Sequence, residues 1–118
     1  MIYSREITID VNSNIFEEFF KTCEYLHKVK RLNCFYDKSI PFQFIINNFN
    51  EDYKNDLISI ENLQIYNTEH IKKDIQIGFS IDKGDYQLFC TNAKNLHIKP
   101  RPLIRILMYK TIKNKENY

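Results

Sequence analysis

The chain has 118 residues, of which 43% are hydrophobic and 27% charged, and its formal net charge is +2. A chain of this size buries about two thirds of its unfolded surface, so it needs neither a metal nor disulfides to fold. We expect one domain over residues 1–118, with 113–118 as a frayed tail. The charge is unevenly distributed, because residues 94–118 hold seven cations and one acid, a net +6, which leaves −4 for the rest.

The predicted location is the cytoplasm. The first residues contain no long apolar segment, and no stretch approaches the roughly 18 apolar residues that a membrane span needs. Cys23, Cys34 and Cys90 are odd in number and widely spaced, which fits reduced thiols better than a disulfide framework. Abundant Ile, Asn and Lys, which have A/T-rich codons, indicate an AT-rich genome.

The N-terminal part predicts a strand followed by a long helix. Over residues 5–11, Ile7, Ile9 and Val11 alternate with polar residues, as in a half-buried strand. Asn14, with Glu17 three positions on, forms a possible capping box. Apolar residues then recur at helical spacing, which predicts a helix over about 14–32.

The middle of the chain predicts antiparallel strands. Residues 42–46 alternate, and residues 58–65 alternate with a phase change near 61–62 that suggests a bulge. The strongest pattern is a hairpin over 75–90 with Lys83-Gly84 as its turn. It would place six residues on one face beneath the helix: Ile77, Phe79, Ile81, Tyr86, Leu88 and Cys90.

The C-terminal part predicts a short strand and a helix. Leu96 and Ile98 suggest the strand, which Pro100 ends, and Pro102 suits the first turn of a helix. An edge strand over 102–112 is the alternative. The predicted fold class is therefore α+β: an N-terminal strand and long helix packed on a four- to five-stranded antiparallel meander, with a short C-terminal helix.

Candidate catalytic and metal-binding groups have simpler structural explanations. Cys23 and His27 share a helix face and could begin a zinc site, but no Cys-x-x-Cys motif supports it, and Cys23 lies on the apolar stripe. Cys90 and His97 could form a nucleophile pair, but the hairpin register buries Cys90. No phosphate-binding or hydrolase motif occurs. We predict no catalytic residue, metal or cofactor, and favour a non-enzyme.

The basic C-terminal segment is the candidate partner-binding site. Cations mixed with an aromatic residue are typical of surfaces that bind phosphates or acidic proteins. The alternative is that the segment forms a solvent-exposed helix, in which cations near the C-terminal end are stabilised by the helix dipole. The predicted partner-binding residues are Lys99, Arg101, Arg105, Tyr109, Lys110 and Lys113.

Surface tyrosines favour protein recognition, because Tyr and Arg are enriched at protein interfaces. Seven tyrosines mostly fall outside the predicted buried positions: Tyr3, Tyr25, Tyr36, Tyr53, Tyr66, Tyr109 and Tyr118. The leading hypothesis is a small non-enzymatic binding protein, an inhibitor or immunity-type protein or an accessory module. The alternative is nucleic-acid binding through residues 94–115.

A third hypothesis is small-molecule or lipid binding. The hydrophobic pattern over residues 7–19 resembles the strand-to-helix start of helix-grip, lipid-transfer-like domains. The predicted helix-over-sheet arrangement would need a cavity between the helix face bearing Phe16, Phe19 and Cys23 and the hairpin face bearing Ile77, Phe79 and Leu88. The alternative is that these side chains fill the space as a packed core. The sequence leaves open the identity of the partner, the biological process and the oligomeric state.

Overall fold

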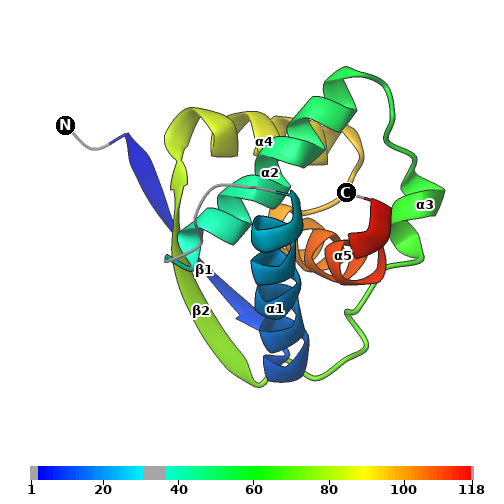
Figure 1. Cartoon of the computed structure of the whole chain (residues 1–118). Coiled ribbons are helices and arrows are strands. Elements are labelled where there is room, and N and C mark those ends of the chain that lie inside the picture. The colour runs from blue at the N-terminus through cyan, green and yellow to red at the C-terminus, as the bar shows by residue number, and fades with distance from the viewer. Residues whose placement is uncertain (1–2, 31–36, 118) are drawn as a thin grey trace.

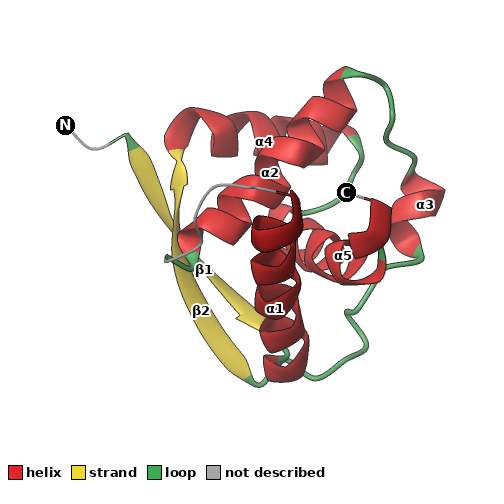
Figure 2. Ribbon diagram, in the orientation of Figure 1, coloured by secondary structure: helices red, strands yellow, loops and turns green. Residues whose placement is uncertain are grey.

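The computed structural model describes residues 3–30 and 37–117 of the chain. Within these residues, five α-helices and one 3₁₀ turn pack on one side of a two-stranded antiparallel sheet (Figures 1 and 2). No helix among them is both long enough and apolar enough to cross a membrane. The elements are β1 (Ser4–Val11), α1 (Ser13–Lys30), α2 (Ser39–Lys54), α3 (Ile60–Gln64), β2 (Ile75–Asp82), α4 (Lys83–Asn95), α5 (Pro100–Lys113) and η1 (Lys115–Asn117).

β1 and β2 form a ribbon with one buried and one polar face. They pair from Ser4 opposite Asp82 to Val11 opposite Ile75. The predicted first strand is confirmed, since Ile7, Ile9 and Val11 are buried as the alternation requires. On the outer face, the Ser80 hydroxyl donates to the Glu6 carboxylate, and Gln76 Nε2 donates to Asp10 Oδ1 at 3.2 Å.

The predicted four- to five-stranded meander is wrong, because β2 pairs with β1 and the segments expected as its neighbours are helical. Residues 42–46 lie inside α2. The alternation of Phe42, Phe44 and Ile46 concealed a second pattern, in which buried pairs recur every four residues. That spacing gives a helix one continuous buried face. The buried residues of α2 are Pro41, Phe42, Ile45, Ile46, Phe49 and Asn50.

The predicted hairpin over 75–90 is also wrong beyond Asp82. The Asp82 carboxylate caps α4 by accepting a hydrogen bond from the Asp85 backbone N–H at 3.0 Å. Gly84 lacks the positive φ that the predicted turn required. Phe89 is fully buried and Leu88 is 50% exposed, the reverse of the hairpin expectation.

Two further predicted strands are absent from the described residues. Residues 58–65 contain the short helix α3, whose cap Ser59 accepts from the Asn62 N–H and which buries Leu63. Residues 96–98 instead close α4. His97 has a φ of 59°, and the Ile98 N–H bonds the Ala93 carbonyl, as in a Schellman C-cap.

The two predicted helices are confirmed with shifted ends. Residues 31 and 32 of the expected 14–32 helix lie outside the described residues, and α1 begins at Ser13. Its cap is Asn12 and not Asn14, because Asn12 Oδ1 accepts from the backbone N–H groups of Asn14 and Ile15, both at 3.1 Å. The segment 102–112 is helical, and α5 begins at Pro100.

The core lies between the ribbon and the helices, with α5 at its centre. α5 packs against α1, α2, α3 and α4, and it buries a continuous face. Between α1 and the ribbon, the ring of Phe42 stacks on Phe79, with ring centroids 4.0 Å apart and planes at 8°. Phe16 and Phe19 of α1 contact the same Phe42 ring. α2 therefore occupies the place that the meander prediction gave to a strand.

Candidate interaction surface

Two of the predicted partner-binding residues bind the chain's own backbone. Arg101 Nε donates to the Thr8 carbonyl at 2.7 Å, and Arg105 Nη1 donates to the Asp10 carbonyl at 2.9 Å. These carbonyls lie on the edge of β1 that is not paired with β2. Exposed strand edges pair readily with other chains, so side chains that occupy this edge protect it.

The Arg105 guanidinium also forms an internal ion pair. Its Nε lies 3.0 Å from Glu69 Oε1, and Lys73 Nζ lies 2.8 Å from Glu69 Oε2. Burial alone would raise the pKa of Glu69, but the hydrogen bonds and charges of Lys73 and Arg105 outweigh it and hold that pKa below its ordinary value. Arg105 therefore has a structural role, and its side chain is only 13% exposed.

Other predicted residues gather at the opposite end of α5. Lys113 Nζ lies 5.2 Å from the centroid of the Tyr109 ring, and that ring packs edge-on against Tyr66 at 6.5 Å. Lys115 Nζ lies 5.2 Å from the centroid of the Tyr25 ring on α1. We call this group the tyrosine–lysine surface: Tyr25, Tyr66, Tyr109, Lys113 and Lys115.

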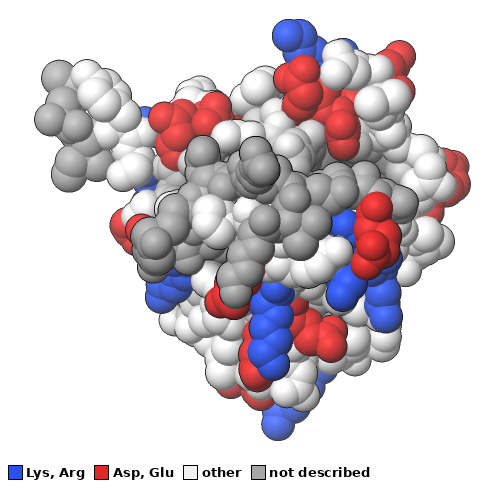
Figure 3. All heavy atoms as spheres, in the orientation of Figure 1, with Lys and Arg blue, Asp and Glu red and all other residues white. Residues whose placement is uncertain are grey.

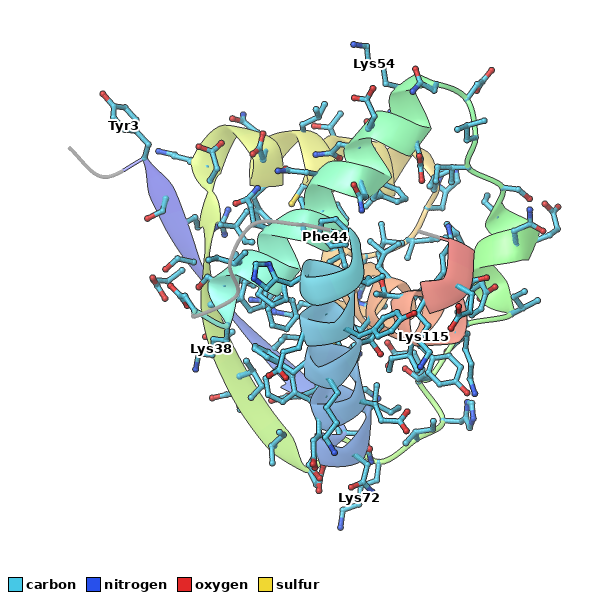
Figure 4. All side chains as sticks on the ribbon, viewed as in Figure 1. Tyr3, Lys38, Phe44, Lys54, Lys72 and Lys115 are labelled. Atoms are coloured by element: carbon cyan, nitrogen blue, oxygen red, sulfur yellow. The ribbon has the colours of Figure 1, made fainter. Side chains whose placement is uncertain are left out.

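The tyrosine–lysine surface is accessible and held in place. Figure 3 shows Lys and Arg atoms beside α1 near the C-terminal end of the chain, and Figure 4 shows Lys115 beside α1. Tyr25, Lys113 and Lys115 are exposed, whereas Tyr66 and Tyr109 are half-buried. Asn114 Nδ2 donates to the Tyr66 hydroxyl at 2.8 Å. The rings are thus fixed by neighbours while part of their area faces solvent.

The remaining predicted cations lie elsewhere. Lys99 lies with Lys94 and His97 around a hollow of about 510 Å³ at the turn from α4 to α5. Lys110 is half-buried beside a small crevice between α2 and α5. The basic segment is therefore divided among four places: the hollow, the β1 edge, the crevice at Lys110 and the tyrosine–lysine surface.

The cysteines and histidines do not form a metal cluster in the described part of the chain, where no group of three or more potential metal-binding side chains occurs. Cys34 lies outside that part. Burial raises the pKa of the Cys23 thiol to about 12, as expected for a core residue.

Cys90 and His97 both line the hollow at the turn from α4 to α5, and Cys90 is half-buried. The pKa of Tyr86 is raised, mainly by burial and secondly by the adjacent Cys90.

The cavity required for lipid binding is filled by a side chain. The Phe42 ring occupies the space between Phe19 and Phe79, at centroid distances of 5.4 Å and 4.0 Å. Leu88, which was expected to line that cavity, lies on the outer side of α4. The geometry therefore gives no support to the third hypothesis.

Comparisons with known proteins do not assign the chain to a family. No protein-family model, curated protein or solved structure matches it.

Sequence reasoning missed part of what the fold brings together. Tyr66 was expected at the surface, but its distance along the sequence from Tyr109 hid the contact between the two rings. Lys115 was expected in a frayed tail, and no local signal placed it next to Tyr25. Tyr36 and Tyr118 lie outside the described residues.

Proposed function

We propose that this protein is a non-enzymatic binding protein that recognises an acidic surface of another protein through its tyrosine–lysine surface. The observation that carries the proposal is the presence of two lysine–tyrosine pairs, Lys113 with Tyr109 and Lys115 with Tyr25, with Tyr66 packed edge-on against Tyr109. Tyrosine rings give large contact areas at low entropic cost, and they are frequent energetic centres of protein interfaces.

Preorganisation supports this proposal. Tyr66 is held by Asn114, and Tyr109 packs against Tyr66, so these rings lose little freedom when a partner binds. A fixed surface of this kind suits an inhibitor or immunity-type protein, which acts by covering part of its target. We propose that role ahead of an accessory subunit.

Nucleic-acid binding has weaker support because the C-terminal cations are divided. Arg101 and Arg105 bind the β1 edge, which separates the hollow at Lys94 and Lys99 from the tyrosine–lysine surface. A duplex contacting one group of about two cations would give a log–log salt slope near −2, whereas a continuous basic row would give about −4 to −5. A steep slope would support nucleic-acid binding and count against our proposal.

The test is capture of the partner followed by quantitative binding. Tagged protein, purified from the cells that make it naturally, should retain a protein that the double variant Tyr25→Ser, Lys115→Glu does not retain. The matched control is Tyr3→Ser, Lys72→Glu, which changes one exposed tyrosine and one exposed lysine elsewhere (Figure 4). We expect titration of the isolated pair to show at least about a tenfold loss for the first variant, or about 1.4 kcal/mol. Equal binding by both variants would refute the proposal.

A further inference from the structure

A second site lies on a different part of the molecule, in a groove of about 570 Å³ between α2 and α4. Its floor contains two asparagines joined across the helices. Asn92 Nδ2 donates to Asn50 Oδ1 at 3.1 Å, and Asn50 Nδ2 donates to the Asp85 carbonyl at 3.1 Å. Asn50 is 9% exposed and Asn92 is 5% exposed. We call this hollow the amide groove.

The amide groove presents a hydrogen-bond acceptor that the protein does not use. No described residue donates a hydrogen bond to Asn92 Oδ1. Because no described side-chain oxygen is both fully buried and without a partner, Asn92 Oδ1 keeps some accessible area, and Asn92 is one of the residues that line the groove. A nearly buried amide oxygen that faces a groove favours a ligand with N–H or O–H donors.

Carboxylates line the same groove. Asp85 Oδ2 accepts from Gln43 Nε2 at 2.9 Å, and no described residue donates to its Oδ1. Glu51 is exposed, and the contact from Asn55 to its carboxylate is long, at 3.4 Å. In Figure 3, acidic atoms cover the C-terminal half of α2 and the start of α4. The hydrogen-bond acceptors of the groove are therefore supplemented by negative charge.

The groove also has an apolar wall and one competing cation. Leu88 is 50% exposed, and the half-buried Tyr53 also lines the groove. Lys54 projects from the end of α2 (Figure 4) and makes no ion pair with a described residue. With two carboxylates and one ammonium, the lining keeps a net charge of −1.

We propose that the amide groove binds an organic cation with an alkyl chain, either a primary ammonium or a guanidinium group. Its N–H groups donate to Asn92 Oδ1, the Asp85 carboxylate two turns earlier on α4 supplies the attracting negative charge, and its alkyl chain packs on Leu88. A lysine or arginine side chain of a partner protein and a free alkylamine share this chemistry. The site is separate from the tyrosine–lysine surface, so failure of either proposal leaves the other standing.

The test is an NMR titration of the ¹⁵N-labelled protein with n-butylammonium. The Asn92 and Asn50 side-chain amide signals should shift and saturate, with half-saturation at about 1 mM, as expected for a weak binding site. Tetramethylammonium is the control, because it has the same charge but no N–H donor, and it should not produce these shifts. Equal effects of the two cations would overturn the proposal, as would shifts that do not saturate.

Variants assign the site to named groups. Asp85→Asn should weaken n-butylammonium binding about tenfold. Lys54→Gln should strengthen it, because the competing positive charge is removed from an exposed side chain. Glu61→Gln, an exposed carboxylate on α3, is the matched control and should change nothing. Unchanged binding in both Asp85→Asn and Lys54→Gln would overturn the proposal.

The source of the cation is decided by a second titration, with the blocked peptide Gly-Gly-Arg-Gly. Tighter binding of the peptide than of n-butylammonium would support a protein side chain as the ligand. Weaker peptide binding, with the n-butylammonium shifts intact, would support a free alkylamine. Absence of Asn92 and Asn50 shifts with both probes would overturn the proposal.

Discussion

Arg101 and Arg105, one turn apart on α5, bind the carbonyls of Thr8 and Asp10, two residues apart on β1. The spacings match, because four helical residues rise about 6 Å and two strand residues advance about 6.8 Å. The other side of the ribbon repeats the arrangement, since Ser39 Oγ and Gln43 Oε1 of α2 accept from the backbone N–H groups of Ser80 and Asp82, both at 2.8 Å. Helix side chains thus occupy both edges of this sheet.

We expect Arg105→Ala to lower the free energy of unfolding by about 2–3 kcal/mol, because it removes charged hydrogen bonds from both Glu69 and the β1 edge. Arg101 is exposed, and Arg101→Ala should cost about 1 kcal/mol. Urea denaturation measures both changes. Lys113→Ala is the control and should stay within about 0.5 kcal/mol of the native protein; a similarly small loss for Arg105→Ala would contradict the structural role.

Stability should depend on the ionisation of Glu69. Its folded-state pKa lies below the ordinary value of 4.5, so the contribution is present above that value and is lost as the pH falls through the lowered pKa. The free energy of unfolding should therefore decline more steeply in acid for the native protein than for Glu69→Gln. Glu17→Gln is the control, because its ion pair with Lys21 is exposed. Parallel curves for the native protein and Glu69→Gln would contradict this prediction.

The described cysteines should differ in reactivity. With Cys34 replaced by Ser, iodoacetamide should modify Cys90 in the folded protein and leave Cys23 intact, because burial of Cys23 raises its pKa to about 12 and blocks access. Mass spectrometry of tryptic peptides measures both rates. In urea above the unfolding midpoint, the two thiols should react at similar rates. Modification of Cys23 as fast as Cys90 under native conditions would place Cys23 outside the core.

The sequence supports some elements well because their signals are local. Alternation identified β1, and helical spacing identified α1 and α5. Some segments fit both the two-residue period of a strand and the 3.6-residue period of a helix, and the local pattern then does not determine the secondary structure. Phe42 and Ile46 are compatible with both, and only packing against Phe79 and α5 selects the helix α2. The pairing of β1 with β2 joins segments more than 60 residues apart, and no periodicity encodes such a partner.

The same limit applies to the candidate sites. The sequence indicated a basic C-terminal segment and surface tyrosines, but the role of each cation depends on what the fold places beside it. Arg105 meets Glu69 and the β1 edge, whereas Lys113 meets Tyr109. The amide groove was missed because Asn50 and Asn92 are 42 residues apart, and no local pattern brings them together.

The neighbouring residues Leu88 and Phe89 distinguish the helix α4 from the predicted hairpin. A hairpin in the expected register would bury Leu88 and expose Phe89, whereas α4 exposes half of Leu88 and buries Phe89 against Phe49, at a ring-centroid distance of 5.4 Å. Phe89→Ala should therefore lower the free energy of unfolding by about 3–5 kcal/mol. Leu88→Ala should cost less than about 1 kcal/mol. Denaturant titration of both variants measures the difference. A larger loss for Leu88→Ala than for Phe89→Ala would restore the hairpin, and it would also remove the wall on which the alkyl chain packs in the amide groove.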